Sequence, residues 1–283
     1  MEPTVREWLR GAAARLAGSV DSPRVDAEVL LGHVLGASRS SLFAEGDRAL
    51  TGPERSALDE LVERRCAGEP LQYLTGHQAF RTLDIAVGPG VLVPRPETEI
   101  VVETALRHLD GVEAPLVADI GTGSGAIALS VAAERPDATV WATEISPEAV
   151  AWAERNRVAA GAANVTVVTG DLFAPLPAGL RGRLDLVVAN PPYLTDVQVG
   201  SAAPDVRDHE PWVALVSGPT GLEVPSRVID DATVWLRPGG WLVMETWPGQ
   251  AEDLIGLMGH RYVDAGAVAD LAGSLRAVAA RKP

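Results

Sequence analysis

Hydrophobic side chains in residues 1–70 recur every three or four positions, which is the spacing of helices that bury one face. Two such segments carry the apolar residues Val5, Trp8, Leu9, Ala12, Ala13 and Leu16, and then Val29, Leu30, Val34 and Leu35. A third helix is predicted to begin at Thr51, because Pro53 suits its first turn and Glu54 completes a capping box. The pattern therefore predicts a small helical domain over residues 1–70.

The pattern changes between residues 71 and 96, where short extended pieces are interrupted by turn-forming residues. These are Gly76, Gly88, Pro89, Gly90, Pro94 and Pro96. Short runs broken in this way are typical of hairpins and connectors. We expect residues 71–96 to form a β-hairpin linker.

From residue 97 to residue 283, strand-like apolar runs alternate with helix-like segments. Strands are predicted at Leu116–Ile120, Thr139–Thr143, Val165–Thr169, Leu184–Ala189 and Trp241–Glu245, with a closing pair at Tyr262–Val268 and Leu275–Ala280. Helices are predicted over Ala126–Arg135 and Pro147–Ala160. Because near-continuous apolar strands separated by helices indicate a parallel sheet covered on both faces, residues 97–283 are predicted to form a doubly wound α/β domain.

Composition narrows the class of protein. With 47% hydrophobic residues in 283, the chain can bury a large core, so a disordered chain is excluded. No apolar run reaches the ~18 residues of a membrane span, and Met1–Thr4 does not resemble the start of a signal peptide, so a cytoplasmic protein without membrane association is expected. The single cysteine, Cys66, and five scattered histidines predict neither a disulfide nor a metal site.

The net charge of the chain helps to distinguish a protein substrate from a nucleic-acid substrate. Twenty-four basic and 38 acidic residues give a formal net charge of −14, and Lys282 is the only lysine. Proteins that grip phosphate backbones usually carry a clustered positive face. The composition therefore favours a protein substrate and predicts no direct binding of nucleic acid.

A glycine-rich turn joins the first predicted strand of the α/β domain to its first helix. Its residues are Asp119, Ile120, Gly121, Thr122, Gly123, Ser124 and Gly125. Glycines let the backbone turn tightly and approach a ligand closely, so the turn is predicted to bind a nucleotide-like cofactor. Continued through Ala126, the same turn also fits the pattern of an NAD site, and taken alone it leaves that alternative open.

Two further acidic residues favour a different cofactor. Glu144 ends the second strand, where a carboxylate can accept hydrogen bonds from ribose hydroxyls, and Asp171 follows the third strand, beside the expected position of an adenine. Asp119, directly before the glycines, suits a cofactor with a cationic amino-acid end better than one with a pyrophosphate. These residues favour S-adenosyl-L-methionine, whose product would be S-adenosyl-L-homocysteine.

The tetrapeptide Asn190-Pro191-Pro192-Tyr193 follows the fourth strand, at the edge of the sheet where ligands bind in such folds. An amide or exocyclic amine nitrogen is a poor nucleophile because its lone pair is delocalised. The Asn190 oxygen and the Pro191 carbonyl can each accept one N–H and aim that lone pair at a methyl donor. Because prolines fix φ and add no donor, the segment predicts catalysis by positioning, with Tyr193 packing on the flat group.

Several stretches together resemble one family, the HemK family of peptide chain release factor glutamine methyltransferases. The resemblance is carried by Leu71–Gly76, Val91–Glu99, the glycine turn, Gly170–Phe173, Asn190–Tyr193, Glu210-Pro211 and Leu236–Gly240. It implies a helical N-terminal domain, a hairpin linker and a Rossmann-like class I methyltransferase domain with a mostly parallel seven-stranded sheet. It also implies methyl transfer from S-adenosylmethionine to the glutamine of the Gly-Gly-Gln loop in bacterial class I release factors. Because the helical domain is separate from the cofactor site, we expect it to dock the protein substrate.

The resemblance also implies roles for single residues. Gly121 to Gly125, Glu144 and Leu172 are expected at the cofactor, and Asn190 to Tyr193 at the substrate glutamine. Phe80 and Arg95–Thr98 are expected to wall the site.

The chain departs from the family pattern in three places. Glu144 stands where Asp is common. In Met244–Trp247, Thr-Trp follows the Glu where the family often has Ile-Gly. The stretch Leu271–Leu275 lacks an Arg-Asp pair that is often seen there.

Other interpretations stay open at this point. An amino-methyltransferase acting on a nucleic-acid base would use the same tetrapeptide, and a close relative would methylate a glutamine of a ribosomal protein. An NAD-dependent oxidoreductase or a non-catalytic nucleotide-binding module would lack a use for Asn190. We expect a monomer and place His209 in a loop, and the sequence leaves open whether Trp212 and Trp247 line the cleft.

Overall fold

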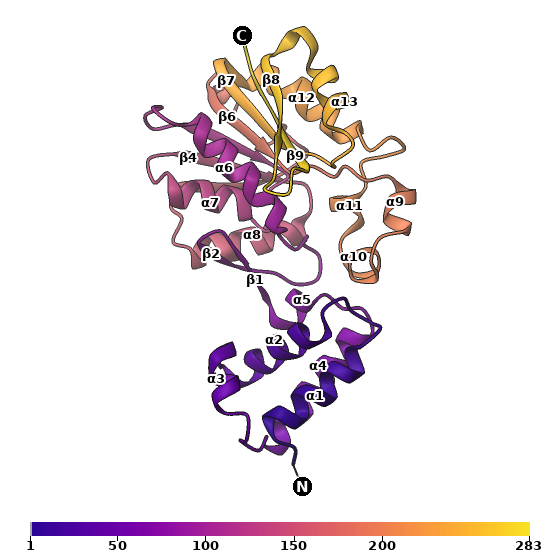
Figure 1. The fold of residues 1–283 in the computed structure, drawn as a ribbon. Coiled ribbons are helices and arrows are strands. Elements are labelled where there is room, and N and C mark those ends of the chain that lie inside the picture. The colour runs from indigo at the N-terminus through magenta and orange to yellow at the C-terminus, as the bar shows by residue number, and fades with distance from the viewer. Residues whose placement is uncertain (1) are drawn as a thin grey trace. The chain divides into compact units, whose positions relative to one another are not determined.

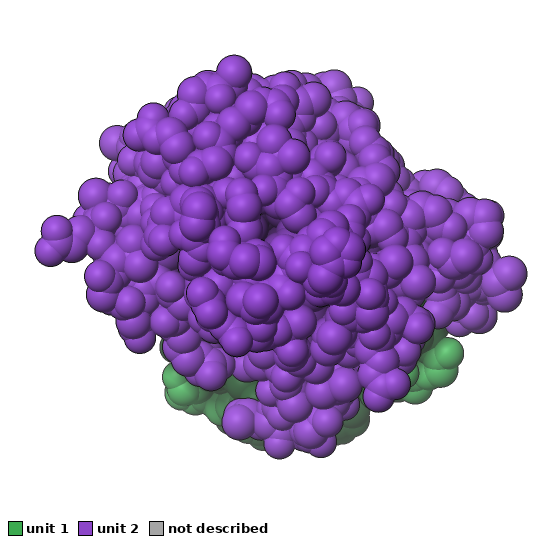
Figure 2. All heavy atoms as spheres, turned by 90° about the horizontal axis from the view of Figure 1, so that it is seen from above, with its two compact units in different colours: residues 1–77, 202–209 green, residues 78–201, 210–283 purple. Residues whose placement is uncertain are grey.

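The computed structural model describes residues 2–283, and the chain divides into two compact units. The first contains residues 1–77 together with 202–209, and the second contains residues 78–201 and 210–283 (Figure 2). Each unit has its own core and is described separately below.

The first unit is helical (Figure 1). It contains α1 (Val5–Leu16), α2 (Pro23–Leu35), α3 (Arg39–Ala44), α4 (Gly52–Cys66), α5 (Leu71–Thr75) and the distant α10 (Pro204–His209). The predicted capping box at Thr51 is formed: Thr51 Oγ1 accepts from Glu54 N, and Glu54 Oε2 accepts from Thr51 N. The Arg65 guanidinium, mostly buried, binds Asp26 at 2.8 Å and approaches Asp205 at 3.6 Å, which ties α10 to this unit.

The second unit is built on a seven-stranded sheet in the order β5-β4-β3-β6-β7-β9-β8 (Figure 1). The strands are β3 (Leu116–Ile120), β4 (Thr139–Glu144), β5 (Val165–Thr169), β6 (Leu184–Ala189), β7 (Leu236–Glu245), β8 (Val263–Ala269) and β9 (Leu275–Arg281). The five from β5 to β7 are parallel, and β9 is antiparallel to both of its neighbours. The chain order reverses between β3 and β6, and ligands bind at such switch points in open α/β sheets.

Helices cover both faces of the sheet. The helices α6 (Glu99–His108), α7 (Ala126–Glu134) and α8 (Pro147–Ala159) pack side by side on one face. The helices α12 (Glu223–Trp235) and α13 (Ala251–Met258) pack on the other. The shorter elements are η1 (Pro96–Thr98), η2 (Ala178–Leu180), α9 (Asp196–Gly200), α11 (Trp212–Leu215) and η3 (Gly259–Arg261).

The predicted α/β class is confirmed, and the parallel strands lie where the apolar runs placed them. A small two-stranded sheet of β1 (His77–Phe80) and β2 (Leu83–Ala86) lies within the residues expected to form a hairpin. The structure extends β7 back to Leu236, because Leu184 pairs with Leu236 before a register shift to Leu186 and Trp241. Among residues 2–283, none of the helices has both the length and the apolar character needed to cross a membrane.

Candidate active site

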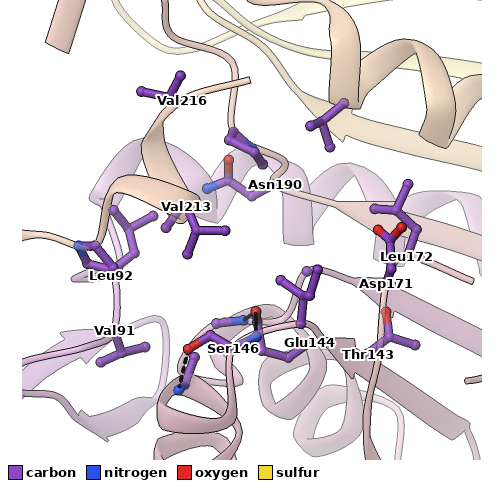
Figure 3. Close-up of a pocket in the computed structure, with 18 of the residues that line it drawn as sticks. Val91, Leu92, Thr143, Glu144, Ser146, Asp171, Leu172, Asn190, Val213 and Val216 are labelled. Carbon is purple, nitrogen blue, oxygen red and sulfur yellow. Dashed lines mark hydrogen bonds between the residues drawn. The ribbon is translucent and has the colours of Figure 1, made fainter. Parts of the chain in front are cut away.

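A pocket of about 200 Å³ opens at the carboxyl ends of β3, β4, β5 and β6 (Figure 3). Its lining residues come from seven stretches of chain: Gly90, Val91 and Leu92; Gly121 and Gly123; Thr143 to Ser146 with Ala149; Gly170, Asp171 and Leu172; Asn190 and Pro192; Pro211, Val213, Ala214 and Val216; and Val224 and Arg227. Seven of the residues predicted from sequence are among them: Gly121, Gly123, Glu144, Asp171, Leu172, Asn190 and Pro192. The topology thus brings the predicted cofactor turn and the predicted catalytic loop to one cavity.

The glycine turn adopts a backbone that other residues rarely adopt. Gly121, Gly123 and Gly125 have φ angles of 75°, 56° and 86°. The N–H groups of Gly121 and Thr122 both donate to Thr143 O at 2.9 Å, which fixes the turn against the end of β4. Of the other predicted residues here, Thr122 and Ser124 are buried, and neither they nor Gly125 lines the pocket.

Asp119 lies behind the turn rather than in the pocket. Its Oδ2 atom accepts hydrogen bonds from Thr122 Oγ1 at 2.6 Å and Ala128 N at 3.1 Å. Its Oδ1 atom is buried and has no partner among the described residues. Burial raises the pKa of Asp119 to about 7, and the nearby charge of Glu144 acts in the same direction. Asp119 therefore holds the turn in place and keeps one unsatisfied acceptor beside it.

Glu144 connects two turns at the pocket floor. Its Oε2 atom accepts from Gly123 N at 2.9 Å, and its Oε1 atom accepts from Ser146 N at 2.9 Å (Figure 3). Each carboxylate oxygen has a second lone pair, so both can still accept a hydroxyl from a bound sugar. The longer Glu side chain thus reaches both backbone groups while it faces the cavity.

The segment after β5 forms another side of the pocket. Leu172 has a φ of 46°, a left-handed conformation that is uncommon for residues other than glycine. This conformation accompanies the placement of the Leu172 side chain in the pocket lining. Asp171 pairs with Arg227 of α12 at 2.5 Å, and both residues line the cavity. An apolar surface and an ion pair therefore share this side.

Asn190 occupies the position directly after β6. Its Nδ2 atom donates to Thr98 Oγ1 at 3.4 Å, while its Oδ1 atom accepts no hydrogen bond from the described residues. Asn190 and Pro192 line the pocket, and Pro191 is buried beneath them. The amide nitrogen of Asn190 is therefore hydrogen-bonded within the protein, and its amide oxygen can accept a hydrogen bond from a ligand.

Tyr193 supports the loop from outside the pocket lining. Its hydroxyl donates to Glu245 Oε1 at 3.2 Å, and its ring lies 6.2 Å from that of Trp247. Its carbonyl oxygen accepts from Gln250 Nε2 at 3.1 Å. Burial raises the pKa of the Tyr193 phenol well above its usual value, so the hydroxyl stays a donor.

One apolar part of the pocket lining was missed by reasoning from the sequence. Val91, Leu92, Val213 and Val216 line the pocket, and no periodic pattern marked them (Figure 3). The only signal was their position within or close to stretches of family resemblance.

Glu210 connects the segment that contains Val91 and Leu92 with the segment that contains Val213 and Val216. Its carboxylate binds Arg95 and accepts from Val93 N at 3.1 Å.

Three other candidates for the walls do not line this pocket. Phe80 is 1% exposed and belongs to the core, and Trp212 and Trp247 are exposed residues outside the pocket lining. Within residues 2–283, no cluster of three His, Cys, Asp or Glu side chains suited to a metal ion occurs.

The fold and the pocket define a Rossmann-like methyltransferase. Residues 7–76 match the family described as PrmC N-terminal domain, and residues 97–205 match the one described as Methyltransferase small domain. A release factor glutamine methyltransferase of Moorella thermoacetica is 46% identical over 252 residues, 88% of this chain and 87% of that protein. One of Koribacter versatilis is 39% identical over 281 residues, 99% of each. The chain therefore belongs to the release factor glutamine methyltransferase family.

Solved structures support the fold independently. A Thermus thermophilus 16S rRNA methyltransferase in complex with AdoMet and guanosine superposes with a TM-score of 0.53 at 20% identity, covering 73% of this chain and 50% of that one. At that identity the likeness shows the shared fold alone.

Proposed function

We propose that this chain transfers a methyl group from S-adenosyl-L-methionine to the side-chain amide nitrogen of the glutamine in the Gly-Gly-Gln loop of bacterial class I peptide chain release factors. The proposal is supported by the name that its relatives carry, release factor glutamine methyltransferase. The observation that carries it is Asn190, whose Nδ2 is bound by Thr98 and whose Oδ1 is left as an acceptor in the pocket.

The residues present fit S-adenosylmethionine. Asp119 does not line the pocket, but its Oδ1 is a buried acceptor beside the glycine turn with no partner among the described residues, and we assign it to the cationic amino-acid end of the cofactor. Glu144 supplies carboxylate oxygens for the ribose, and Leu172 and Val224 supply apolar surface for a flat base. Gly121 and Gly123 leave open space where a Cβ would stand, so a ligand can approach their backbone.

When bound, S-adenosylmethionine would supply an electrophilic methyl carbon for the substrate nitrogen, with S-adenosylhomocysteine as the leaving group. Asn190 Oδ1 accepts one N–H of the substrate amide, and the carbonyl of Pro191 is the second acceptor that we assign. Accepting both N–H groups enriches the nitrogen and fixes its direction, and one of these protons is released to water once the nitrogen carries the methyl group. No side chain here has to remove that proton beforehand, because orientation supplies the rate gain.

The prolines and Tyr193 keep the acceptors in place. Pro191 and Pro192 offer no N–H that would compete for the acceptors, and their φ angles are fixed. Tyr193, the residue after the two prolines, is held at its side chain by Glu245 and at its backbone by Gln250.

The wider setting suits a protein substrate. The net charge of −14 disfavours the phosphate backbone of a nucleic acid, so we assign a release factor and no direct nucleic-acid contact. We assign release factor docking to the helical unit, and we expect a monomer that works in the cytoplasm.

Mass spectrometry tests the proposal directly. The enzyme is incubated with isotopically labelled methyl donor and each of several purified release factors, and the labelled residue is located by peptide fragmentation. We expect one label, on the glutamine of the Gly-Gly-Gln loop. A label on ribosomal protein or on ribosomal RNA in parallel reactions, with none on the release factors, would refute the substrate assignment.

A further inference from the structure

A buried carboxyl group lies at the same edge of the sheet as the catalytic loop, and the methyl-transfer mechanism above leaves it without a direct role. Glu245 ends β7, which is parallel to β6, and Ala189 pairs with Met244. The next residues along the two strands, Asn190 and Glu245, are therefore neighbours in register. Glu245 is only 4% exposed, yet it is an acid among apolar residues. Burying such a group without a function costs stability.

Glu245 contacts both ends of the catalytic segment, once directly and once through Thr98. Tyr193 donates its hydroxyl hydrogen to Oε1 at 3.2 Å. The side chain of Thr98, 3% exposed, faces the same carboxyl group and also accepts the Nδ2–H of Asn190. The Oε2 atom has no partner among the described residues that meets hydrogen-bond geometry.

The direction of this chain of groups matters for the reaction. A hydroxyl has a single hydrogen, so Thr98 can accept from Asn190 only while its own hydrogen points elsewhere. A carboxylate accepts and never donates, which makes it a suitable end point for that hydrogen. When the Glu245 carboxylate accepts the hydroxyl hydrogen of Thr98, Asn190 presents its nitrogen to Thr98 and its oxygen to the pocket.

We propose that Glu245 is a positioning residue for methyl transfer, which acts through Thr98 and Tyr193 to keep the Asn190 amide oxygen, rather than its nitrogen, turned toward the substrate. This inference rests on the proposed function, because it specifies how the same site presents its acceptor. A glutamine in place of Glu245 adds an N–H₂ group that can donate to Thr98. The Thr98 hydrogen then turns to Asn190 Oδ1, and the Asn190 amide reverses.

The charge state of Glu245 provides a signature. Burial raises the pKa of Glu245 to about 7, which outweighs the lowering of this pKa by the side chains of Thr98 and Tyr193. Glu97 raises this pKa as well, and Arg276 of β9 lowers it; these two residues are 3.8 Å apart. Protonated Glu245 can donate a hydrogen bond, as a glutamine at this position would. We therefore expect kcat, measured at saturating S-adenosylmethionine, to rise with pH through about 7. E245Q should lack this rise.

The experiment compares E245Q and T98V with the matched control T104V. Thr104 is also buried in the same stretch of chain, but its Oγ1 has no partner among the described residues. Steady-state kinetics on a full-length release factor are combined with NMR measurement of hydrogen exchange at the Asn190 side-chain amide. We expect E245Q and T98V to lower kcat by about tenfold or more. KM and S-adenosylhomocysteine affinity should change little, Asn190 amide exchange should become faster, and T104V should behave as wild type.

Two results would overturn the inference. One is wild-type kcat and amide exchange in both E245Q and T98V, and the other is an equal loss in T104V. If E245Q fails to fold, T98V decides alone, since it leaves the carboxyl group in place. A wild-type enzyme with no activity on release factors refutes the proposed function instead, while the exchange measurement, which needs no substrate, still decides the role of Glu245.

Discussion

Glu144 and Gly123 are joined by a hydrogen bond of 2.9 Å from the glycine N–H to Oε2, and the other oxygen of the same carboxylate holds Ser146 N at 2.9 Å. One side chain thus fixes the two turns between which a nucleoside would lie. Since buried hydrogen bonds to a charged acceptor are stronger than neutral ones, the pocket floor depends on the charge of Glu144.

Replacing Glu144 by Gln should therefore weaken both the fold and cofactor binding. A glutamine turns an N–H₂ group toward one of the two backbone N–H groups, which leaves a buried donor unpaired at a cost of about 1–3 kcal/mol. We expect a lower free energy of unfolding in urea and weaker S-adenosylhomocysteine binding by calorimetry. The surface variant E154Q is the control, and a variant E144Q with unchanged affinity would contradict the assignment.

Replacing Asn190 by Ala should remove catalysis and spare cofactor binding. The variant loses the acceptor that orients the substrate amide, and positioning of this kind is worth about two or more orders of magnitude in kcat. Turnover on a release factor and calorimetric titration with S-adenosylhomocysteine check both parts. N164A is a matched control, because the Asn164 side chain donates to Ala132 O and Ala138 O, before β5 and outside the pocket lining. Near-normal turnover in N190A would exclude the mechanism.

Replacing Gly221 by Ala should disturb the catalytic loop from behind. A Cβ at Gly221 would stand 2.5 Å from Tyr193 O and 2.7 Å from Gln250 Nε2, and the φ of 77° is itself unfavourable for alanine. We expect a loss of about 1–3 kcal/mol in stability and a lower kcat, measured by thermal unfolding and kinetics. G256A offers the comparison, since its Cβ would meet no atom within 4 Å. Equal behaviour of the two variants would show that the loop tolerates displacement.

The free energy of unfolding should fall as pH rises from about 5 to about 8. Burial raises the pKa of Asp119 and of Glu245 to about 7, from ordinary values of 3.8 and 4.5. In this window the folded state keeps protons that the unfolded chain has released, so the slope of stability against pH is negative. Urea unfolding at several pH values tests this, and E245Q should show a shallower slope. Stability that increases across the window would disprove the assignment.

Ion pairs give the opposite dependence, but at lower pH. A hydrogen bond to Arg48 holds the pKa of Glu54 at about 2, and one to Arg135 does the same for Asp137. The stability they contribute is present above their ordinary pKa and is lost as pH falls toward 2. It therefore lies outside the window in which Asp119 and Glu245 titrate.

The sequence was informative where local chemistry determines structure. The β6 strand, Leu184–Ala189, was predicted because it is a short apolar run, and the capping box at Thr51 because its residues lie three apart. Asn190 and Gly123 were placed at one edge because carboxyl ends of parallel strands meet there.

What could not be predicted depends on contacts between distant residues. No periodicity links Val91 to Val213, which share a wall only because Glu210 binds Arg95 and Val93 across more than a hundred residues of chain. The hydrogen bond between Asn190 and Thr98 likewise joins residues far apart in sequence. The bonds of Asp119 to Thr122 and Ala128, which place its carboxyl group behind the turn, could not be predicted from the sequence either, and its contact with the cofactor stays a prediction.

The backbone passes from one compact unit to the other three times, after residues 77, 201 and 209. The internal segment 202–209 contacts α4 through the ion pair of Asp205 with Arg65. The chain then continues directly into Pro211 to Val216 of the pocket wall. Trimming the amino-terminal helices would therefore strip the support from an internal loop whose far end shapes the cavity. The release factor docking that we propose for those helices is better measured with point substitutions than with a shortened chain.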